Sequence, residues 1–279
     1  MQYPSSYVDK PDRNQKHPHY EHRTTKLMMK NNEFSEKKFQ RVRRVSNKKK
    51  IIQSFKRIGK CLNDATCEEI PILGLDRVCL ILINNYEHDK HDPKIGPMND
   101  GYLIGLYHHR LGYKIFYLYN CSSEKYPEFL QFFLTNTRRQ LTVFYSGRDS
   151  ISSGSHGIEF KNEIVSSNQF SKIISERSNA KCKVILISDC TAGGSVFDIQ
   201  SVNKGKMISF SVNKATDPDS KEGRRSHGIF TYYFYKILYE QPNITPQRLF
   251  ERMNASLKRF NETFSYYTTD KELENQPIF

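Results

Sequence analysis

The hydrophobic positions of this chain form short runs, most of them after residue 70, and segments with helical spacing separate the runs. The clearest run, at 184–187, has four apolar residues of which three are β-branched, and it predicts a strand buried on both faces. Further strands are predicted at 78–83, 113–118, 141–145 and 207–212, with a short hairpin near 158–160. Helices are predicted at 99–111, 126–137, 169–176, 229–239 and 246–260. This alternation predicts an α/β fold, a three-layer sandwich with a mainly parallel central sheet and helices on both faces.

The first 70 residues follow a different pattern. Residues 1–33 are polar and lack apolar periodicity, which predicts a disordered basic tail. Over residues 34–70 apolar positions recur at helical spacing among Lys and Arg, which predicts a basic amphipathic helical segment with a break near 46–47. The globular domain is then expected over residues 71–279.

The excess positive charge belongs to the start of the chain. Residues 1–60 contain 17 Lys and Arg against 5 Asp and Glu, so they hold +12 of the formal net charge of +13. Either the apolar stripe of the helical segment packs on the domain, or the segment binds a nucleic acid or an anionic membrane surface. The basic runs at 41–44 and 48–50 also match a nuclear import signal.

Cysteine spacing and hydropathy bear on the compartment. The six cysteines lack the spacing of a zinc site, and no apolar run reaches about 18 residues. We therefore expect no metal or other cofactor, no membrane span and no signal peptide. A reducing compartment follows, cytoplasmic or nuclear, and the sequence leaves calcium dependence open.

One predicted strand ends in the candidate chemistry of the chain. The strand that begins at Lys183 is followed by Asp189-Cys190-Thr191 and then by two glycines. In open α/β sheets, ligands bind at the edge formed by the carboxyl ends of the strands. Cys190 is therefore either a small buried hydrophobe, the common role of a lone cysteine, or a nucleophile at that edge.

Five segments in this order resemble the caspase and metacaspase superfamily of cysteine peptidases, over about residues 75–279. They are Gly96 to Gly101, Thr142 to Gly147, Lys183 to Asp198, Ser226 to Tyr232, and Asn275-Gln276-Pro277, which is similar to the family's final strand. The resemblance implies a caspase-like sandwich with a large-subunit-like part at 71–200 and a small-subunit-like part at 201–279. It also implies hydrolysis of peptide bonds in a protein or peptide substrate by a thiolate and an imidazole.

The position of the catalytic histidine departs from the family pattern. After Ser146-Gly147 the family has His, whereas this chain has Arg148, and a guanidinium cannot act as a base. Eight residues after Arg148, His156-Gly157 is similar to the His-Gly of caspases. Either an inserted loop has moved the base to His156, with the Gly157 N–H as an oxyanion donor, or the base is lost.

The nucleophile can be aligned in two registers. Counted along the strand, Cys190 takes the family's nucleophile position. Counted back from Ser195, Thr191 takes that position without a gap, and Asp189 then matches an acidic pocket residue of metacaspases. A threonine hydroxyl without an amino-terminal amine is a poor nucleophile. The first register implies a peptidase and the second an inactive relative.

The resemblance also implies a specificity pocket. In metacaspases an acidic pocket accepts Arg or Lys, and Asp100, Asp189 and Asp217 are the candidates for it here, so a preference for basic residues is expected. Asp100 is also a candidate helix cap. The four histidines at positions 88, 91, 108 and 109 are predicted to be surface residues rather than metal ligands.

Three functions stay open. The chain is a cysteine endopeptidase that uses Cys190 and His156, or a caspase-fold pseudopeptidase that binds or regulates other proteins. A pseudopeptidase would compete for substrates or pair with active paralogues. For every candidate the sequence leaves open whether the chain forms a homodimer or a heterodimer with a paralogue. The third function is an adaptor that binds nucleic acid or an anionic surface through residues 1–60.

Overall fold

The structure is a computed structural model. It describes residues 47–85, 95–152, 155–161, 163–190, 196–202, 204–214 and 228–279. All of them belong to one compact unit, Val42–Phe279. The predicted tail at 1–33 and the predicted helical positions at 34–46 lie outside the described residues. In the ranges that are described, no helix has both the length and the apolar character needed to span a bilayer.

A seven-stranded sheet forms the centre of the fold, with the strand order β1-β3-β2-β4-β8-β9-β10. Its strands are β1 (Gly59–Cys61), β2 (Arg77–Ile83), β3 (Lys114–Tyr119), β4 (Gln140–Ser146), β8 (Lys183–Asp189), β9 (Lys206–Lys214) and β10 (Glu262–Thr268). Every pairing is parallel except that of β10 with β9. Strands β2, β4 and β8 are almost completely buried, as their continuous apolar runs predict.

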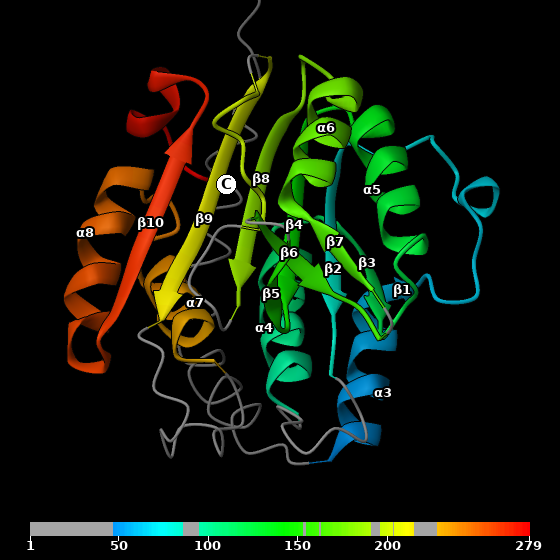
Figure 1. Cartoon of the computed structure of the whole chain (residues 1–279), viewed down its shortest axis with the longest axis horizontal. Helices are drawn as coiled ribbons and strands as arrows, with labels where there is room; N and C mark the ends of the chain where they lie inside the picture. Colours follow the sequence, from blue (N-terminus) through cyan, green and yellow to red (C-terminus); the bar gives the residue numbers. More distant parts are fainter. Residues whose placement is uncertain are drawn as a thin grey trace, which may run out of the picture. The chain divides into compact units, whose positions relative to one another are not determined.

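Helices cover both faces of this sheet (Figure 1). On one face lie α3 (Lys48–Ile58), α4 (Gly96–Arg110) and α7 (Ile229–Glu240), and on the other lie α5 (Lys125–Asn136) and α6 (Ser167–Arg177). Helix α8 (Pro246–Leu257) lies beside the edge strand β10. Short 3-10 turns occur at Cys67–Glu69, Lys258–Phe260 and Lys271–Asn275. The predicted three-layer α/β sandwich with a mainly parallel sheet is confirmed.

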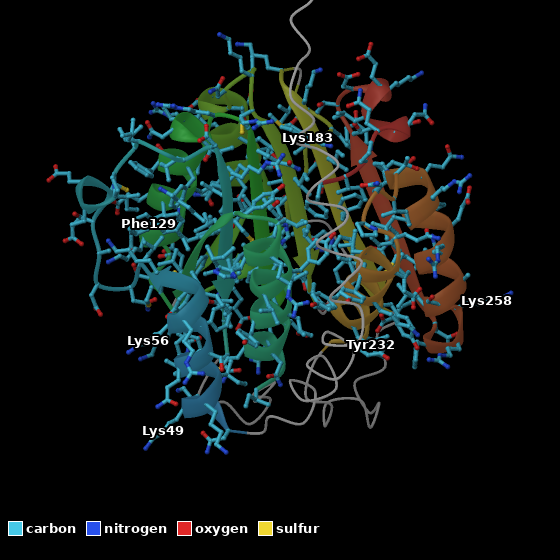
Figure 2. All side chains as sticks on the ribbon, turned by 180° about the vertical axis from the view of Figure 1, so that it is seen from behind. Lys49, Lys56, Phe129, Lys183, Tyr232 and Lys258 are labelled. Atoms are coloured by element: carbon cyan, nitrogen blue, oxygen red, sulfur yellow. The ribbon has the colours of Figure 1, made fainter. Side chains whose placement is uncertain are left out.

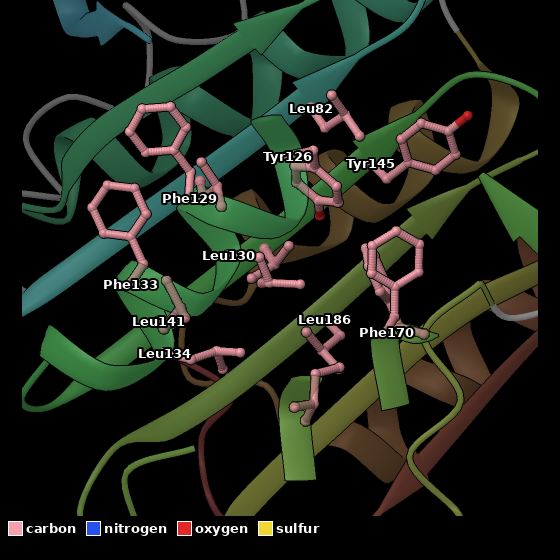
Figure 3. Packing of buried hydrophobic residues seen from close by; sticks show 14 of the residues in the cluster. Leu82, Tyr126, Phe129, Leu130, Phe133, Leu134, Leu141, Tyr145, Phe170 and Leu186 are labelled. Carbon is pink, nitrogen blue, oxygen red and sulfur yellow. The ribbon is translucent and has the colours of Figure 1, made fainter. Parts of the chain in front are cut away.

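A hydrophobic core fills the space between the sheet and helices α5 and α6 (Figure 3). Tyr126, Phe129 and Phe133 of α5 are fully buried there against strand residues such as Leu82 and Leu186. Burial of each large apolar side chain contributes about 1.5–3 kcal/mol. This core holds the strands in register and therefore fixes the positions of their carboxyl ends.

Helix α3 is packed on the domain rather than separate from it. The Asn47 side chain accepts a hydrogen bond from the Lys50 N–H and caps the helix, so the predicted break near 46–47 marks where α3 begins. Ile51 and Phe55 are 2% and 1% exposed, and the Phe55 ring contacts Tyr117 of β3. The apolar stripe of the described helix thus packs on the domain, one of the two interpretations that its sequence leaves open.

Three further features differ from the sequence predictions. The last strand is β10 at 262–268, whereas residues 275–277, which resemble the family's final strand, form no strand. The hairpin near 158–160 is a three-stranded antiparallel sheet of β5 (Asp149–Ser152), β6 (Ser155–Glu159) and β7 (Ile164–Ser166). His108 is fully buried, so its prediction as a surface residue is wrong.

His108 is buried because residues distant in sequence cover its face of α4. Its ring makes edge-on contacts with Tyr113 and Phe279, at centroid distances of 4.9 and 4.8 Å. Its Nδ1 lies 2.9 Å from the Ile104 carbonyl oxygen, so Nδ1 carries the proton that is donated to that carbonyl. Burial lowers the pKa of His108 to about 4, and the ring is neutral at physiological pH.

Candidate functional site

Strand alternation decides which face each candidate side chain reaches. In β8 and the residue after it, Val184, Leu186 and Cys190 belong to the core on the side of α5 and α6. Because successive side chains in a strand point to opposite faces, Asp189 points to the side of α4 and α7. The two neighbours Asp189 and Cys190 therefore lie in different environments, one polar and one apolar.

Asp100 and Asp189 come together at the amino terminus of α7, 89 positions apart in the sequence. The Gly228 N–H, at the N-cap of α7, donates to Asp100 Oδ1 over 2.8 Å. A Cβ on Gly228 would lie 2.3 Å from Asp189 Oδ2 and 3.3 Å from Asp100 Oδ2. Both carboxylates thus approach the same backbone position, and only glycine leaves room for them.

Each of these two carboxylates has further hydrogen-bond partners. Asp189 Oδ2 accepts from the Thr231 backbone N–H at 3.3 Å and from the Thr231 hydroxyl at 2.7 Å. Asp100 Oδ2 accepts from the Ser146 hydroxyl at 3.2 Å. Asp100 and Asp189 are each 3% exposed, and the positive end of the α7 dipole stabilises their negative charges. The pair therefore fixes the start of α7 on the carboxyl edge of the sheet.

The Cys190 thiol lies in the apolar core. Cys190 is 1% exposed and belongs to the cluster that includes Tyr126, Phe170 and Val196. Burial raises the pKa of Tyr126 far above its ordinary value, and Cys121 and Cys190 add to this rise because they lie near its hydroxyl. Thr191, the alternative nucleophile, lies outside the described residues.

Arg148 occupies the position after Ser146-Gly147 and is held by its own partners. Its guanidinium lies 3.9 Å from a carboxylate oxygen of Glu159, and its backbone carbonyl accepts a hydrogen bond from the Tyr145 hydroxyl. The second oxygen of Glu159 accepts from the Ser150 hydroxyl at 2.8 Å. Arg148 is a cation paired with Glu159 of the small sheet, and its guanidinium cannot accept a proton.

His156 lies on β6 of the small sheet, opposite β5. Its Nδ1 is 3.4 Å from Asp149 Oδ2, and the Asp149 side chain is completely buried while the His156 side chain is 32% exposed. The two atoms are within ion-pair distance but are not hydrogen-bonded to each other, so this contact lacks the hydrogen bond that orients a general base. Gly157 follows within β6, where a Cβ would lie 2.6 Å from the Val165 carbonyl oxygen, so the close approach of β7 requires glycine.

The structure thus brings some of the predicted site residues together. Asp100 and Asp189 converge, His156 pairs with Asp149, Cys190 enters the core, and Asp217 lies outside the described residues. Sequence reasoning missed Thr231 and Asp149 as partners of these groups. Thr231 belongs to the segment that resembles the family's small-subunit helix, so the sequence carried a signal for it. Nothing in the sequence marks Asp149.

Metal-ion chemistry has no evident site in the described ranges. No group of three or more His, Cys, Asp and Glu residues is placed there to hold a metal ion. The acidic pair at Gly228 has two carboxylates, and its hydrogen bonds come from protein N–H and O–H donors.

Comparisons with known proteins bear on the fold alone. No protein-family model matches the chain, and no curated protein matches its sequence. Among solved structures, the chain is similar to protein GSU0716 from Geobacter sulfurreducens, with a TM-score of 0.56 and 12% sequence identity. The match covers 73% of this chain and 98% of that protein. At this identity the similarity extends to the fold and to no residue of the site.

Proposed function

We propose that this chain is a caspase-like domain without peptidase activity, which binds a peptide through a basic side chain at the carboxyl edge of its sheet. The observation that carries the proposal is the position of Cys190. A catalytic thiol must reach the carbonyl carbon of a bound peptide, and Cys190 is 1% exposed within an apolar cluster.

The position of Arg148 supports the same proposal. The family pattern has the base directly after Ser146-Gly147, and here that place holds a guanidinium paired with Glu159. Such a group stays protonated at every physiological pH, so it cannot take a proton from a thiol. A caspase-like fold without an accessible thiol at position 190 and without a base directly after Gly147 is suited to binding rather than to hydrolysis.

The acidic pair supports a basic ligand. Asp100 and Asp189 place two negative charges at one point of the edge; both are 3% exposed and hydrogen-bonded to the protein, so they would act on a ligand cation through their charge rather than by direct contact. Asp217, a third acidic residue before α7 in the sequence, lies outside the described residues. An Arg or Lys side chain of a peptide is the complement of such a pair. The resemblance to metacaspases, in which an acidic pocket accepts Arg or Lys, favours the same ligand.

The test uses the full chain with fluorogenic peptides that carry Arg or Lys, and with non-cleavable versions of them. We expect no turnover above that of Cys190→Ala, binding of the Arg peptide, and at least tenfold weaker binding by Asp100→Asn. The matched control is Asp76→Asn, an exposed position directly before β2 and therefore at the opposite edge of the sheet. Robust turnover that disappears in Cys190→Ala contradicts the proposal, and so does equal binding by both variants.

One observation favours an active peptidase as a second candidate function. The His156 ring lies beside the buried Asp149 carboxylate, at 3.4 Å between Nδ1 and Oδ2, and this contact would have to tighten to a hydrogen bond for Asp149 to orient the base. In this candidate His156 takes the Cys190 proton and the thiolate attacks the peptide carbonyl. The C–N bond breaks as His156 gives the proton to the leaving amine, and water then hydrolyses the thioester to release the acid and restore the thiol. Turnover abolished by Cys190→Ala and His156→Ala, and retained in Arg148→Ala, is the outcome that selects it.

A further inference from the structure

The exposed side of α3 is entirely polar and strongly basic. Its residues are Lys49, Lys50, Gln53, Lys56 and Arg57, and all of them are exposed. Viewed from behind the sheet, Lys49 and Lys56 project from the helix away from the domain (Figure 2). The helix contains no acidic residue that would offset these charges. We call the four cations Lys49, Lys50, Lys56 and Arg57 the α3 basic face.

These four cations are not used to hold the domain together. Lys49, Lys50, Lys56 and Arg57 form no ion pair with an acidic side chain in the described part of the chain. Lys49 and Lys50 also lie in the first turn of α3, where the positive end of the helix dipole disfavours a cation. Their placement works against local stability, which points to a role in binding.

The basic surface continues onto the neighbouring helix. Burial raises the pKa of Tyr102 in α4; a hydrogen bond with Ser54 of α3 opposes the rise, and so do the nearby charges of Arg110 and Arg57. Arg110 at the end of α4 therefore lies on the same side of the molecule as Arg57. Residues 1–46, which precede α3, contain further Lys and Arg in excess over Asp and Glu. The positive charge of the described surface thus extends from α3 to Arg110, and the preceding part of the sequence carries a further excess of cations.

The burial of the apolar stripe separates two kinds of anionic partner. A helix that binds a membrane surface inserts its apolar face between the lipid headgroups. In α3 that face is already used, because Ile51 and Phe55 are buried against the domain. Ile52 and Ile58 are partly buried, and the fully exposed side chains of the helix are four cations and one amide. These suit the evenly spaced phosphates of a nucleic acid backbone.

We propose that the α3 basic face binds the phosphate backbone of nucleic acid without sequence preference. Lys49 and Lys56 are seven residues apart, which is about 10 Å along the helix axis, so the four cations span several phosphates. Binding of this kind releases counterions and weakens steeply as salt is added. This surface lies on a different element from the acidic pair, and the proposal is independent of the function proposed for that pair.

The test measures binding of a labelled 25-base-pair DNA duplex and a labelled single-stranded RNA by fluorescence anisotropy, with the full chain at several salt concentrations. The test variant carries Lys49→Gln, Lys50→Gln, Lys56→Gln and Arg57→Gln. The control variant carries Lys172→Gln, Lys181→Gln, Arg248→Gln and Lys258→Gln, four exposed cations elsewhere. Both variants lose the same net charge and keep residues 1–46.

We expect the test variant to bind the duplex about tenfold or more weakly, and its log–log salt slope to be shallower by about 3. The control variant should bind nearly as well as the wild type. The proposal is overturned if the wild type does not bind, if both variants lose binding equally, or if the test variant binds normally. Phosphatidylserine vesicles are the third probe. If the test variant loses binding to these vesicles alone, the proposal is also overturned, because the surface is then assigned to a membrane.

Discussion

Thr231 donates two hydrogen bonds to the Asp189 carboxylate, one from its backbone N–H at 3.3 Å and one from its hydroxyl at 2.7 Å. Asp189 ends β8, and Thr231 lies in the first turn of α7. The first turn of α7 is therefore held to the end of β8 by a buried carboxylate. Because a hydrogen bond to a charged group contributes about 1.5–3 kcal/mol, this contact contributes substantially to the stability of the folded state.

Thr231→Val keeps the shape of the side chain and removes the hydroxyl. We expect it to lower the free energy of unfolding by about 2 kcal/mol, because the buried Asp189 loses its shorter hydrogen bond. The measurement is urea denaturation of both proteins. Thr231→Ser, which keeps the hydroxyl, is the control for lost packing. In an Asp189→Ala background Thr231→Val should cost clearly less, and equal costs in both backgrounds would refute the coupling.

Buried His108 makes the stability depend on pH. The folded pKa is about 4 against an ordinary value of 6.5, so between these values the unfolded chain binds one proton more than the folded chain. Stability from this group is complete above about pH 6.5 and falls as the pH drops toward 4, by about 3 kcal/mol in all.

The pH dependence is measured by urea denaturation from pH 7.5 to 4.5. His108→Gln removes the titrating ring, and we expect its curve to be flatter than that of the wild type over this range. The exposed neighbour provides the control, because His109→Gln should keep the wild-type slope. An unchanged slope in His108→Gln would assign the acid sensitivity to other groups.

The edge of the sheet at β10 is covered by a side chain of α8. The Asn254 amide accepts from the Phe264 N–H at 2.9 Å and donates to the Phe264 carbonyl at 3.1 Å. An open edge strand invites pairing with another chain, and Asn254 occupies the backbone groups that would do so. We expect Asn254→Ala to destabilise the fold by about 1–3 kcal/mol and to increase self-association.

Self-association is followed by sedimentation velocity over a range of protein concentrations. Asn254→Asp is informative as a second variant, since its carboxylate keeps the acceptor for the Phe264 N–H and loses the donor for the carbonyl. Its effect should be intermediate. If Asn254→Ala is as monodisperse as the wild type, the edge is protected by something other than this amide.

The sequence predicts the interior of the fold better than its borders. Strands β2, β4 and β8 are recognisable because continuous apolar runs have few other uses in a domain of this size. Strand β1 has one apolar residue in three, and β10 has one fully buried large side chain, so neither carries a strong pattern. Edge strands are defined by their partners, and these come from distant parts of the chain.

The candidate site shows the same limit. Asp189 ends β8, so the rule that strand ends share one edge places it, whereas Asp100 lies within α4, where it does not cap that helix, and only the family resemblance predicts that the two meet. Their partners Gly228 and Thr231 depend on where α7 begins in space, which no local pattern encodes. The same holds for His108, whose burial is produced by Tyr113 and Phe279 rather than by the spacing of residues within α4.

The two ends of α3 provide a sign test for its charges. Lys49 and Lys50 lie at the positive end of the helix dipole and Lys56 and Arg57 at the negative end. We expect Lys49→Glu with Lys50→Glu to raise the free energy of unfolding by about 1 kcal/mol, and Lys56→Glu with Arg57→Glu to lower it by a similar amount. Thermal unfolding at low salt measures both, and each pair changes the net charge equally.

Because both pairs lie in the α3 basic face, both should weaken nucleic acid binding while moving stability in opposite directions. Shifts of stability in the same direction would mean that net charge, rather than the helix dipole, governs this segment.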